Sequence, residues 1–207
     1  MDITGHRSPR MTSPAASATV SGMSRSSGGP TARRVQITGG VRSGKSAYAE
    51  RLLSGRANVT YLATGPVPDP AADPEWAARI ANHRDRRSPW GWTTVETTEP
   101  ARVLRAADGP VLLDCLGTWL TACLDELEAW QRPVAEWEPA WQVRSAAFVR
   151  AWREADVVGV TNEVGWGVVP EHRSGRLFAD LLGRLNQQVA AASDQVILMV
   201  MGRPITL

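Results

Sequence analysis

The stretch from Gln36 to Glu50, QITGGVRSGKSAYAE, constrains the fold of this chain more than any other. It places a glycine-rich turn between a strand-like run at 33–38 and a helix-like run at 45–55. Its letters match the pattern G-x-x-x-x-G-K-[ST], which between a strand and a helix is typical of a phosphate-binding loop. Backbone N–H groups of such a loop surround phosphate oxygens, and the helix N-terminus adds its positive dipole end. A purely structural glycine-rich turn is the alternative interpretation.

Short apolar runs alternate with longer amphipathic runs along the rest of the chain. The pattern predicts strands and helices, in turn, at 58–65, 74–87, 109–117, 119–154 with a break at Arg132-Pro133, 155–165, 174–193 and 194–202. This alternation implies an α/β fold with a mostly parallel sheet and helices on both faces. The length of 207 residues suits one such domain, which we place at 33–207. The Ser/Ala/Gly/Pro-rich start, residues 1–32, is predicted to be a disordered extension.

The composition argues against several classes of protein. The net charge is only +2, and much of the basic excess lies in the first 34 residues, so no nucleic-acid partner is expected. No apolar run reaches the roughly 18 residues that span a bilayer, and the start lacks the apolar core of a signal peptide. Cys115 and Cys123 are the only cysteines, which favours a reduced, cytoplasmic protein over one held together by disulfides.

The phosphate loop requires a partner that holds a metal ion. Lys45 is expected to contact the β and γ phosphates, and the Ser46 hydroxyl to bind Mg²⁺. Asp114 follows the apolar run PVLL and is expected to be the second Mg²⁺ anchor. The alternative for Asp114 is a helix N-cap or a turn carboxylate. These residues predict Mg²⁺-dependent nucleotide binding and leave the transferred group open.

A histidine lies among arginines in the segment RIANHRDRR. Helical spacing puts His83 four residues from both Arg79 and Arg87. Surrounding cations disfavour the imidazolium form, and a neutral imidazole is a competent nucleophile. Arginines are suited to hold the phosphates that such a nucleophile attacks. The alternative is a solvated basic helix in which the histidine is incidental.

A second polar cluster is predicted at the carboxyl end of the strand at 155–165. This strand ends in the run TNE before a glycine-rich turn, and ligands of parallel α/β sheets bind at that edge. Glu163 is therefore a candidate base for phosphoryl transfer. The alternative is an ion pair of Glu163 with Arg173 or Arg176. Asn186, on an otherwise apolar helix, is predicted to be a satisfied buried amide.

Together these motifs resemble the bifunctional adenosylcobinamide kinase and adenosylcobinamide-phosphate guanylyltransferase family of cobalamin biosynthesis. The resemblance rests on GGVRSGKSAYAE, YLATG, RIANHRDRR, LLDCLGTWL and TNEVGWGVVPEHRSGRLFADLLGRLNQQVAAASDQV, and covers about 34–204. It implies a RecA-like P-loop fold, often assembled as a trimer. It also implies phosphorylation of adenosylcobinamide by ATP or GTP, followed by transfer of GMP from GTP to adenosylcobinamide phosphate with release of pyrophosphate. The family forms a GMP–histidine intermediate.

The resemblance also assigns roles to individual residues. The family's nucleophile falls on His83. Its nucleotide contacts fall on Gly39, Gly40, Val41, Arg42, Ser43, Gly44, Lys45, Ser46, Ala63, Thr64, Gly65, Arg84, Asp85, Arg86, Arg87, Glu96 and Asp114. The sequence departs from the family in a longer loop at 66–74, in one extra residue within RRSPWGW, and at Gly117, where the family often has Thr. None of these departures removes a residue to which chemistry is assigned.

Two other functions are compatible with the residues alone. One is a P-loop kinase of a small molecule in which His83 is structural, and the other is a RecA-like regulatory nucleotide-binding protein without a small substrate. The residues that bind the corrinoid are not identified. The region 119–154 carries five of the nine tryptophans, which could contact an apolar corrinoid face or form the core.

Overall fold

The computed structural model describes residues 33–65 and 71–207. The predicted extension at 1–32 and the loop prolines Pro66, Pro68 and Pro70 lie outside these residues. A seven-stranded sheet has the order β3-β2-β4-β5-β1-β6-β7, with every pair parallel except β6 and β7. The strands are β1 (Arg34–Gly39), β2 (Thr60–Ala63), β3 (Thr93–Glu96), β4 (Val111–Asp114), β5 (Val157–Val160), β6 (Gln195–Val200) and β7 (Arg203–Thr206).

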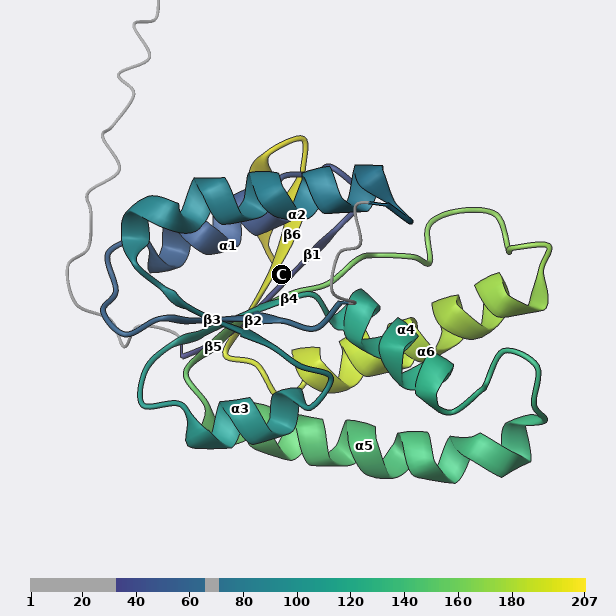
Figure 1. Cartoon of the computed structure of the whole chain (residues 1–207). Coiled ribbons are helices and arrows are strands. Elements are labelled where there is room, and N and C mark those ends of the chain that lie inside the picture. Colours follow the sequence, from purple (N-terminus) through teal and green to yellow (C-terminus); the bar gives the residue numbers. More distant parts are fainter. Residues whose placement is uncertain (1–32, 66–70) are drawn as a thin grey trace, which may run out of the picture. The chain divides into compact units, whose positions relative to one another are not determined.

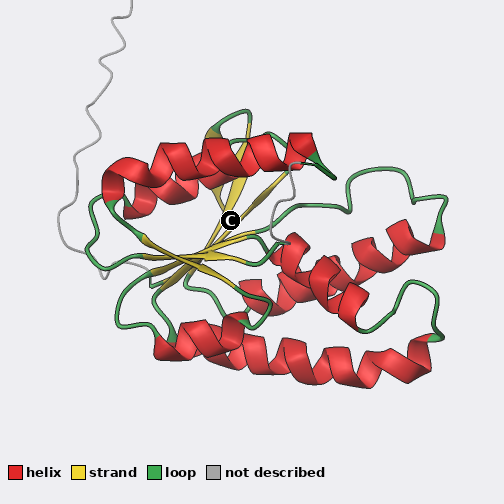
Figure 2. Cartoon of the chain, in the orientation of Figure 1, coloured by secondary structure: helices red, strands yellow, loops and turns green. Residues whose placement is uncertain are grey.

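Helices cover both faces of the sheet (Figures 1 and 2). They are α1 (Lys45–Leu53), α2 (Pro74–Arg87), α3 (Pro100–Ala106), α4 (Leu116–Glu126), α5 (Val134–Glu154) and α6 (Arg173–Ala190). Helices α1 and α2 lie on one face, and α3 to α6 lie on the other (Figure 1). The expected α/β fold, a mostly parallel sheet with helices on both faces, is therefore confirmed. No helix in the part of the chain that the structure describes is long and apolar enough to cross a bilayer.

The two faces of the sheet have separate apolar cores. Successive residues of a strand point to opposite faces. Leu112 accordingly joins the core beneath α1, together with Ile37 and Val158, whereas Leu113 joins the larger core on the side of α3 to α6. Burial on both faces explains why these strands are continuous apolar runs.

The tryptophan-rich region forms part of the core. Trp119, Trp137, Trp141 and Trp152 are all at most 5% exposed, and Trp119 and Trp152 both pack against Phe148 with tilted rings. Of the two roles left open for these tryptophans, core packing is therefore correct for these four. A corrinoid could not reach their ring faces without unfolding α4 or α5.

Several predicted boundaries need correction. The helix predicted at 74–87 is confirmed as α2. The strand predicted at 58–65 is shorter, because β2 covers only Thr60–Ala63. The strand predicted at 109–117 is β4, which ends at Asp114. Helix α4 begins at Leu116 because the chain turns at Cys115, whose backbone N–H is bonded to the Thr118 hydroxyl at 3.2 Å. Two strands and a helix were not predicted, namely β3, β7 and α3. The two strands are edge strands whose residues are mostly exposed, so they lack an apolar run.

Candidate active site

The phosphate loop connects β1 to α1 and has a backbone that only glycine adopts readily at two positions. Gly39 has φ of +147° and Gly44 has φ of +93°. A β-carbon at Gly39 would lie 2.5 Å from the carbonyl oxygen of Met199. The loop is also tied to the β6–β7 turn, because the Gly202 N–H donates to the Ser43 carbonyl at 3.0 Å. The local geometry is therefore set by β1 and β6 together.

Gly39→Ala is expected to lower the free energy of unfolding by about 2–4 kcal/mol, because the added methyl group meets a backbone oxygen and the φ angle is strained. The matched control is Gly40→Ala, since a β-carbon there has no atom within 4 Å. Urea unfolding of both variants checks this. Equal stabilities of the two variants would contradict the close approach of β6 to Gly39.

Three predicted site residues lie side by side on neighbouring strands of the sheet. Glu96, Ala63, Asp114 and Val160 are register partners on β3, β2, β4 and β5 in succession. Each stands at the carboxyl end of its strand, the edge at which parallel α/β sheets bind ligands. The row therefore lies along the edge from which the phosphate loop emerges.

A cavity of about 210 Å³ opens above this row, and we call it the central cavity. Among the predicted site residues, those that line it are Lys45, Ser46, Ala63, Gly65, His83, Arg84, Arg87, Glu96 and Asp114. A second cavity of about 760 Å³ is lined by Arg42, Ser43, Gly44 and Arg86, and again by Lys45, Ser46 and His83. The phosphate-loop lysine and the histidine thus face both cavities.

Some predicted contacts line neither cavity. Gly39, Gly40, Val41, Thr64 and Asp85 are absent from both linings. The buried Thr64 hydroxyl donates to the Cys115 carbonyl at 2.8 Å, and Val41 and Asp85 are exposed. Thr64 is fully buried, so its side chain stabilises the turn after β4 and does not face either cavity.

His83 projects from α2 towards the tip of β4. Its Nδ1 lies 3.6 Å from Asp114 Oδ2 and 3.3 Å from Arg86 Nη2. Burial lowers the pKa of His83 below its usual value; the Asp114 carboxylate opposes this shift, and Arg86 adds to it. The imidazole is therefore favoured in its neutral form, as expected, but desolvation contributes more than the arginines do.

Asp114 is held from a neighbouring strand. The Tyr61 hydroxyl on β2 donates to Asp114 Oδ2 at 3.3 Å, and burial raises the pKa of Tyr61, which keeps the phenol protonated. The N-cap position of α4 belongs to Cys115, so the alternative role of Asp114 as a helix cap is wrong. Its carboxylate is free to face the central cavity.

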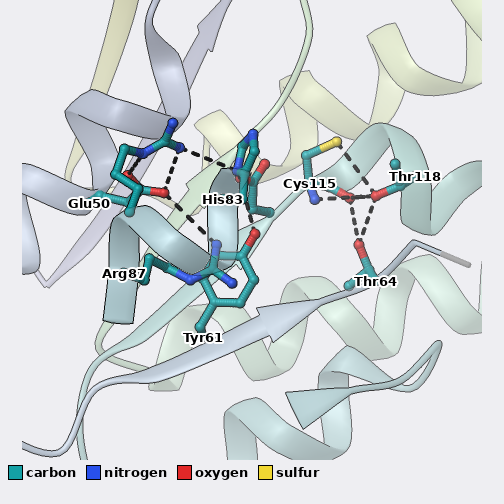
Figure 3. Close-up of polar contacts among 9 residues, drawn as sticks. Glu50, Tyr61, Thr64, His83, Arg87, Cys115 and Thr118 are labelled. Carbon is teal, nitrogen blue, oxygen red and sulfur yellow. Dashed lines mark hydrogen bonds and ion pairs between the residues drawn. The ribbon is translucent and has the colours of Figure 1, made fainter. Parts of the chain in front are cut away.

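The arginines of α2 have different partners, and Figure 3 shows Arg87 between Glu50 and the Tyr61 ring. Arg84 pairs with Glu96 at 2.6 Å, and Arg86 pairs with the buried carboxylate of Glu50. Arg87 is 6% exposed and lies over the Tyr61 ring, with its Cζ 3.3 Å from the ring centroid. A solvated basic helix is therefore not what the structure shows, because Arg87 is buried and the His83 side chain is only 16% exposed.

Lys45 is largely buried at the start of α1. Its Nζ donates to the Gly40 carbonyl at 2.8 Å, within the loop. Burial lowers the pKa of Lys45, although the Asp114 carboxylate opposes the shift. A phosphate that entered the loop would offer this ammonium group a stronger acceptor than a neutral carbonyl.

Glu163 lies beside the phosphate loop but outside both cavity linings. Its backbone N–H donates to the Gly39 carbonyl at 3.2 Å, and its carboxylate accepts the Gly165 N–H at 3.1 Å. The alternative ion pairs are wrong, because Arg173 and Arg176 donate to backbone carbonyls instead. Asn186 is a satisfied amide as predicted, because its side chain bonds both the Thr161 hydroxyl and the Asn162 carbonyl, but it is only half-buried.

Sequence reasoning missed several residues of the site. Tyr61, Thr94, Cys115 and Thr118 also line the central cavity, and so does Asn162, which belongs to the polar run TNE predicted at this edge. One signal could have identified Tyr61: it lies two residues before the end of a strand that neighbours Asp114 in a parallel sheet. No group of three or more His, Cys, Asp or Glu side chains in residues 33–65 and 71–207 is arranged to hold a metal ion.

Comparisons with known proteins agree with the resemblance. The family model described as cobinamide kinase / cobinamide phosphate guanyltransferase matches residues 35–207. The bifunctional adenosylcobalamin biosynthesis protein CobU of Salmonella typhimurium is 41% identical over 181 residues, which cover 81% of this chain and 96% of the relative. CobU of Escherichia coli is 42% identical, with coverage of 81% and 96%. The protein CobP of Pseudomonas aeruginosa is 40% identical, with coverage of 83% and 95%.

Proposed function

The chain belongs to the cobinamide kinase / cobinamide phosphate guanyltransferase family, and from that premise we propose how one site carries out both reactions. The protein is a bifunctional transferase of cobalamin biosynthesis, with a kinase activity and a guanylyltransferase activity. The finer assignments below concern the adenosylated substrate, the nucleotides, the metal ion and the residues. The observation that carries them is the convergence of Lys45, Ser46, His83 and Asp114 on one cavity.

For the kinase reaction, the triphosphate lies in the loop after β1. Lys45 and the backbone N–H groups of the loop bind the β and γ phosphates, and charge that develops on the transferred phosphoryl group is stabilised there. ATP or GTP serves as donor. The acceptor is the hydroxyl of the aminopropanol arm of adenosylcobinamide. Glu163 stays a prediction for the base, since it stands beside the loop without lining the cavity.

Ser46 and Asp114 fit a Mg²⁺ site. Their donors are a hydroxyl and a carboxylate, and Mg²⁺ usually takes one or two protein oxygens together with phosphate oxygens and water. A cluster of three acidic or histidine ligands is therefore not required. The Tyr61 and His83 contacts both use Oδ2 of Asp114, so its other oxygen would be left to hold the ion. When bound, Mg²⁺ supplies positive charge that offsets the charge of the phosphates.

For guanylyl transfer, the nucleophile is the neutral imidazole of His83. Its lone pair attacks the α-phosphorus of GTP, an N–P bond forms, and pyrophosphate leaves with the electrons of the broken P–O bond. A phosphate oxygen of adenosylcobinamide phosphate then attacks the same phosphorus. The N–P bond breaks, its electrons return to the imidazole, and adenosylcobinamide-GDP is released.

The second ring nitrogen of His83 has a role in this step. Attack by Nε2 requires the proton on Nδ1, where the Asp114 carboxylate at 3.6 Å accepts it. Because arginine can only donate, Arg86 Nη2 then contacts Nδ1 at 3.3 Å by packing, without a hydrogen bond. A carboxylate beside Nδ1 also stabilises positive charge on the ring while the phosphorus is transferred. The predicted nucleophilic nitrogen is therefore Nε2.

Product analysis distinguishes this function from its alternatives. The protein is incubated with adenosylcobinamide, Mg²⁺ and either ATP or GTP, and the products are identified by mass spectrometry. We expect adenosylcobinamide phosphate first, and adenosylcobinamide-GDP with pyrophosphate once GTP is present. A reaction that yields adenosylcobinamide phosphate but no adenosylcobinamide-GDP would indicate a monofunctional kinase. Nucleotide binding without either product would indicate a regulatory protein.

We also propose that the protein is a homo-oligomer, with the trimer implied by the family resemblance as the expected form. Trp166, Val168 and Val169 lie between β5 and α6 and are 72%, 95% and 74% exposed. Neighbouring exposed apolar side chains of this size mark interaction surfaces. The reducing, cytoplasmic location stays a prediction, and the free thiols of Cys115 and Cys123 are compatible with it.

Light scattering after size-exclusion chromatography tests the oligomer. We expect three times the monomer mass for the native chain and a smaller mass for the double variant Trp166→Ser, Val168→Ser. Val143→Ser is the control, because Val143 is 69% exposed on α5, a different element from the segment between β5 and α6. A native chain that is monomeric at micromolar concentration would contradict the proposal.

A further inference from the structure

A buried acid on α1 lies outside the residues assigned to either reaction. Glu50 is 1% exposed, and a carboxylate so far from water needs a cationic partner. Arg86 supplies it with two bonds, from Nε to Oε2 at 2.5 Å and from Nη2 to Oε1 at 2.8 Å. Such a two-pronged pair fixes the orientation of the guanidinium group as well as its distance.

The same guanidinium group contacts the histidine. Arg86 Nη2, which binds Glu50 Oε1, lies 3.3 Å from Nδ1 of His83 (Figure 3). Glu50 stands four residues after Ser46 on α1, whereas His83 and Arg86 stand on α2. The contacts therefore run from the helix that carries the phosphate loop, through Arg86, to the imidazole ring.

Arg87 adds a second attachment of α2. It is packed over Tyr61, whose hydroxyl bonds Asp114, and its Nη1 lies 4.0 Å from Glu50 Oε1. Two consecutive arginines thus reach one carboxylate from the last turn of α2. The family resemblance assigns Arg86 to nucleotide contact. Because its Nε and Nη2 already bind Glu50, these two nitrogens are engaged and fewer N–H donors are left for a phosphate.

We propose that Glu50 is a positioning residue for guanylyl transfer, because it holds Arg86 against the His83 ring and so fixes the imidazole beside the phosphate loop. Glu50 itself touches neither substrate. This inference rests on the proposed function of His83 as the nucleophile. Loss of Glu50 should affect guanylyl transfer but not the kinase reaction, because phosphoryl transfer uses the loop at the start of α1 and has no need of the histidine.

The test compares both reactions in Glu50→Gln. Glutamine has nearly the shape of glutamate but lacks the charge and one acceptor, so Arg86 loses its fixed orientation. A misplacement of about 1 Å costs about 100-fold in rate, so we expect formation of the GMP adduct at saturating GTP to fall by about that factor. The KM for GTP and the kinase kcat are expected to change by less than about threefold, because the loop is intact.

Asp156→Asn is the matched control. It breaks another arginine–carboxylate pair, the exposed Arg56 with the half-buried Asp156 at 2.7 Å, at the amino end of β5 and away from the site. We expect both reactions of this variant to match the native protein. The shorter variant Glu50→Asp keeps the charge but cannot make both contacts, and it is expected to show the same selective loss if Glu50→Gln folds poorly.

The outcomes separate this inference from the function on which it rests. An equal fall in both reactions, or unchanged adduct formation in a folded Glu50 variant, would overturn the positioning role and leave Glu50 as a structural ion pair. If the native protein transfers GMP but forms no adduct, the histidine intermediate itself fails. Thermal melting of every variant excludes loss of fold as the cause of a selective effect.

Discussion

His83→Ala is expected to abolish guanylyl transfer and to reduce the kinase activity far less. Removal of a covalent nucleophile leaves no atom to form the phosphorus–nitrogen bond, so we expect formation of adenosylcobinamide-GDP to fall by about 10⁴-fold or more. The kinase reaction depends on Lys45 and the loop, and we expect it to fall by no more than about tenfold. Separate steady-state assays of the two products measure both rates.

His172→Ala is the matched control for this variant. His172 is the exposed residue that precedes α6, and it lines neither cavity. Both activities of the control are expected to equal those of the native protein. If His83→Ala retained guanylyl transfer, direct attack of the substrate phosphate on GTP would replace the two-step reaction.

Lys45→Met is expected to impair both reactions together. The side chain keeps its length but loses the ammonium group that faces both cavities. Loss of one preorganised charge at a phosphate costs about 10²–10³-fold in rate, and we expect a loss of that size in each reaction. Arg51→Met is the control, because Arg51 is an exposed cation in the last turn of the same helix. If one reaction kept its full rate, the two reactions would require separate phosphate sites.

The central part of the fold follows from local sequence signals. The phosphate loop, α1 and α2 were predicted because Gly39, Gly44 and Pro74 mark turns and a helix start at fixed positions. The buried strands were predicted because both faces are apolar. The edge strands β3 and β7 could not be predicted in the same way, because they gain their hydrogen bonds from a neighbour and bury few side chains.

The composition of the site was predictable, but its connections were not. The residue types at Lys45, His83 and Asp114 indicate their chemistry. That His83 lies 3.6 Å from Asp114 depends on how α2 packs across the edge of the sheet, and no local pattern encodes this. Glu50 illustrates the same point, since it is an ordinary helical acid in the sequence and its partner Arg86 is 36 residues away.

The covalent intermediate is the central claim, and one measurement tests it most directly. The native protein is incubated with Mg²⁺ and GTP labelled either at the α-phosphate or on the guanine, denatured, and examined for bound label. We predict an adduct from both labels that is acid-labile and base-stable, maps to His83, and is absent from His83→Ala. Active protein that carries no adduct, or an adduct on another residue, would contradict the account.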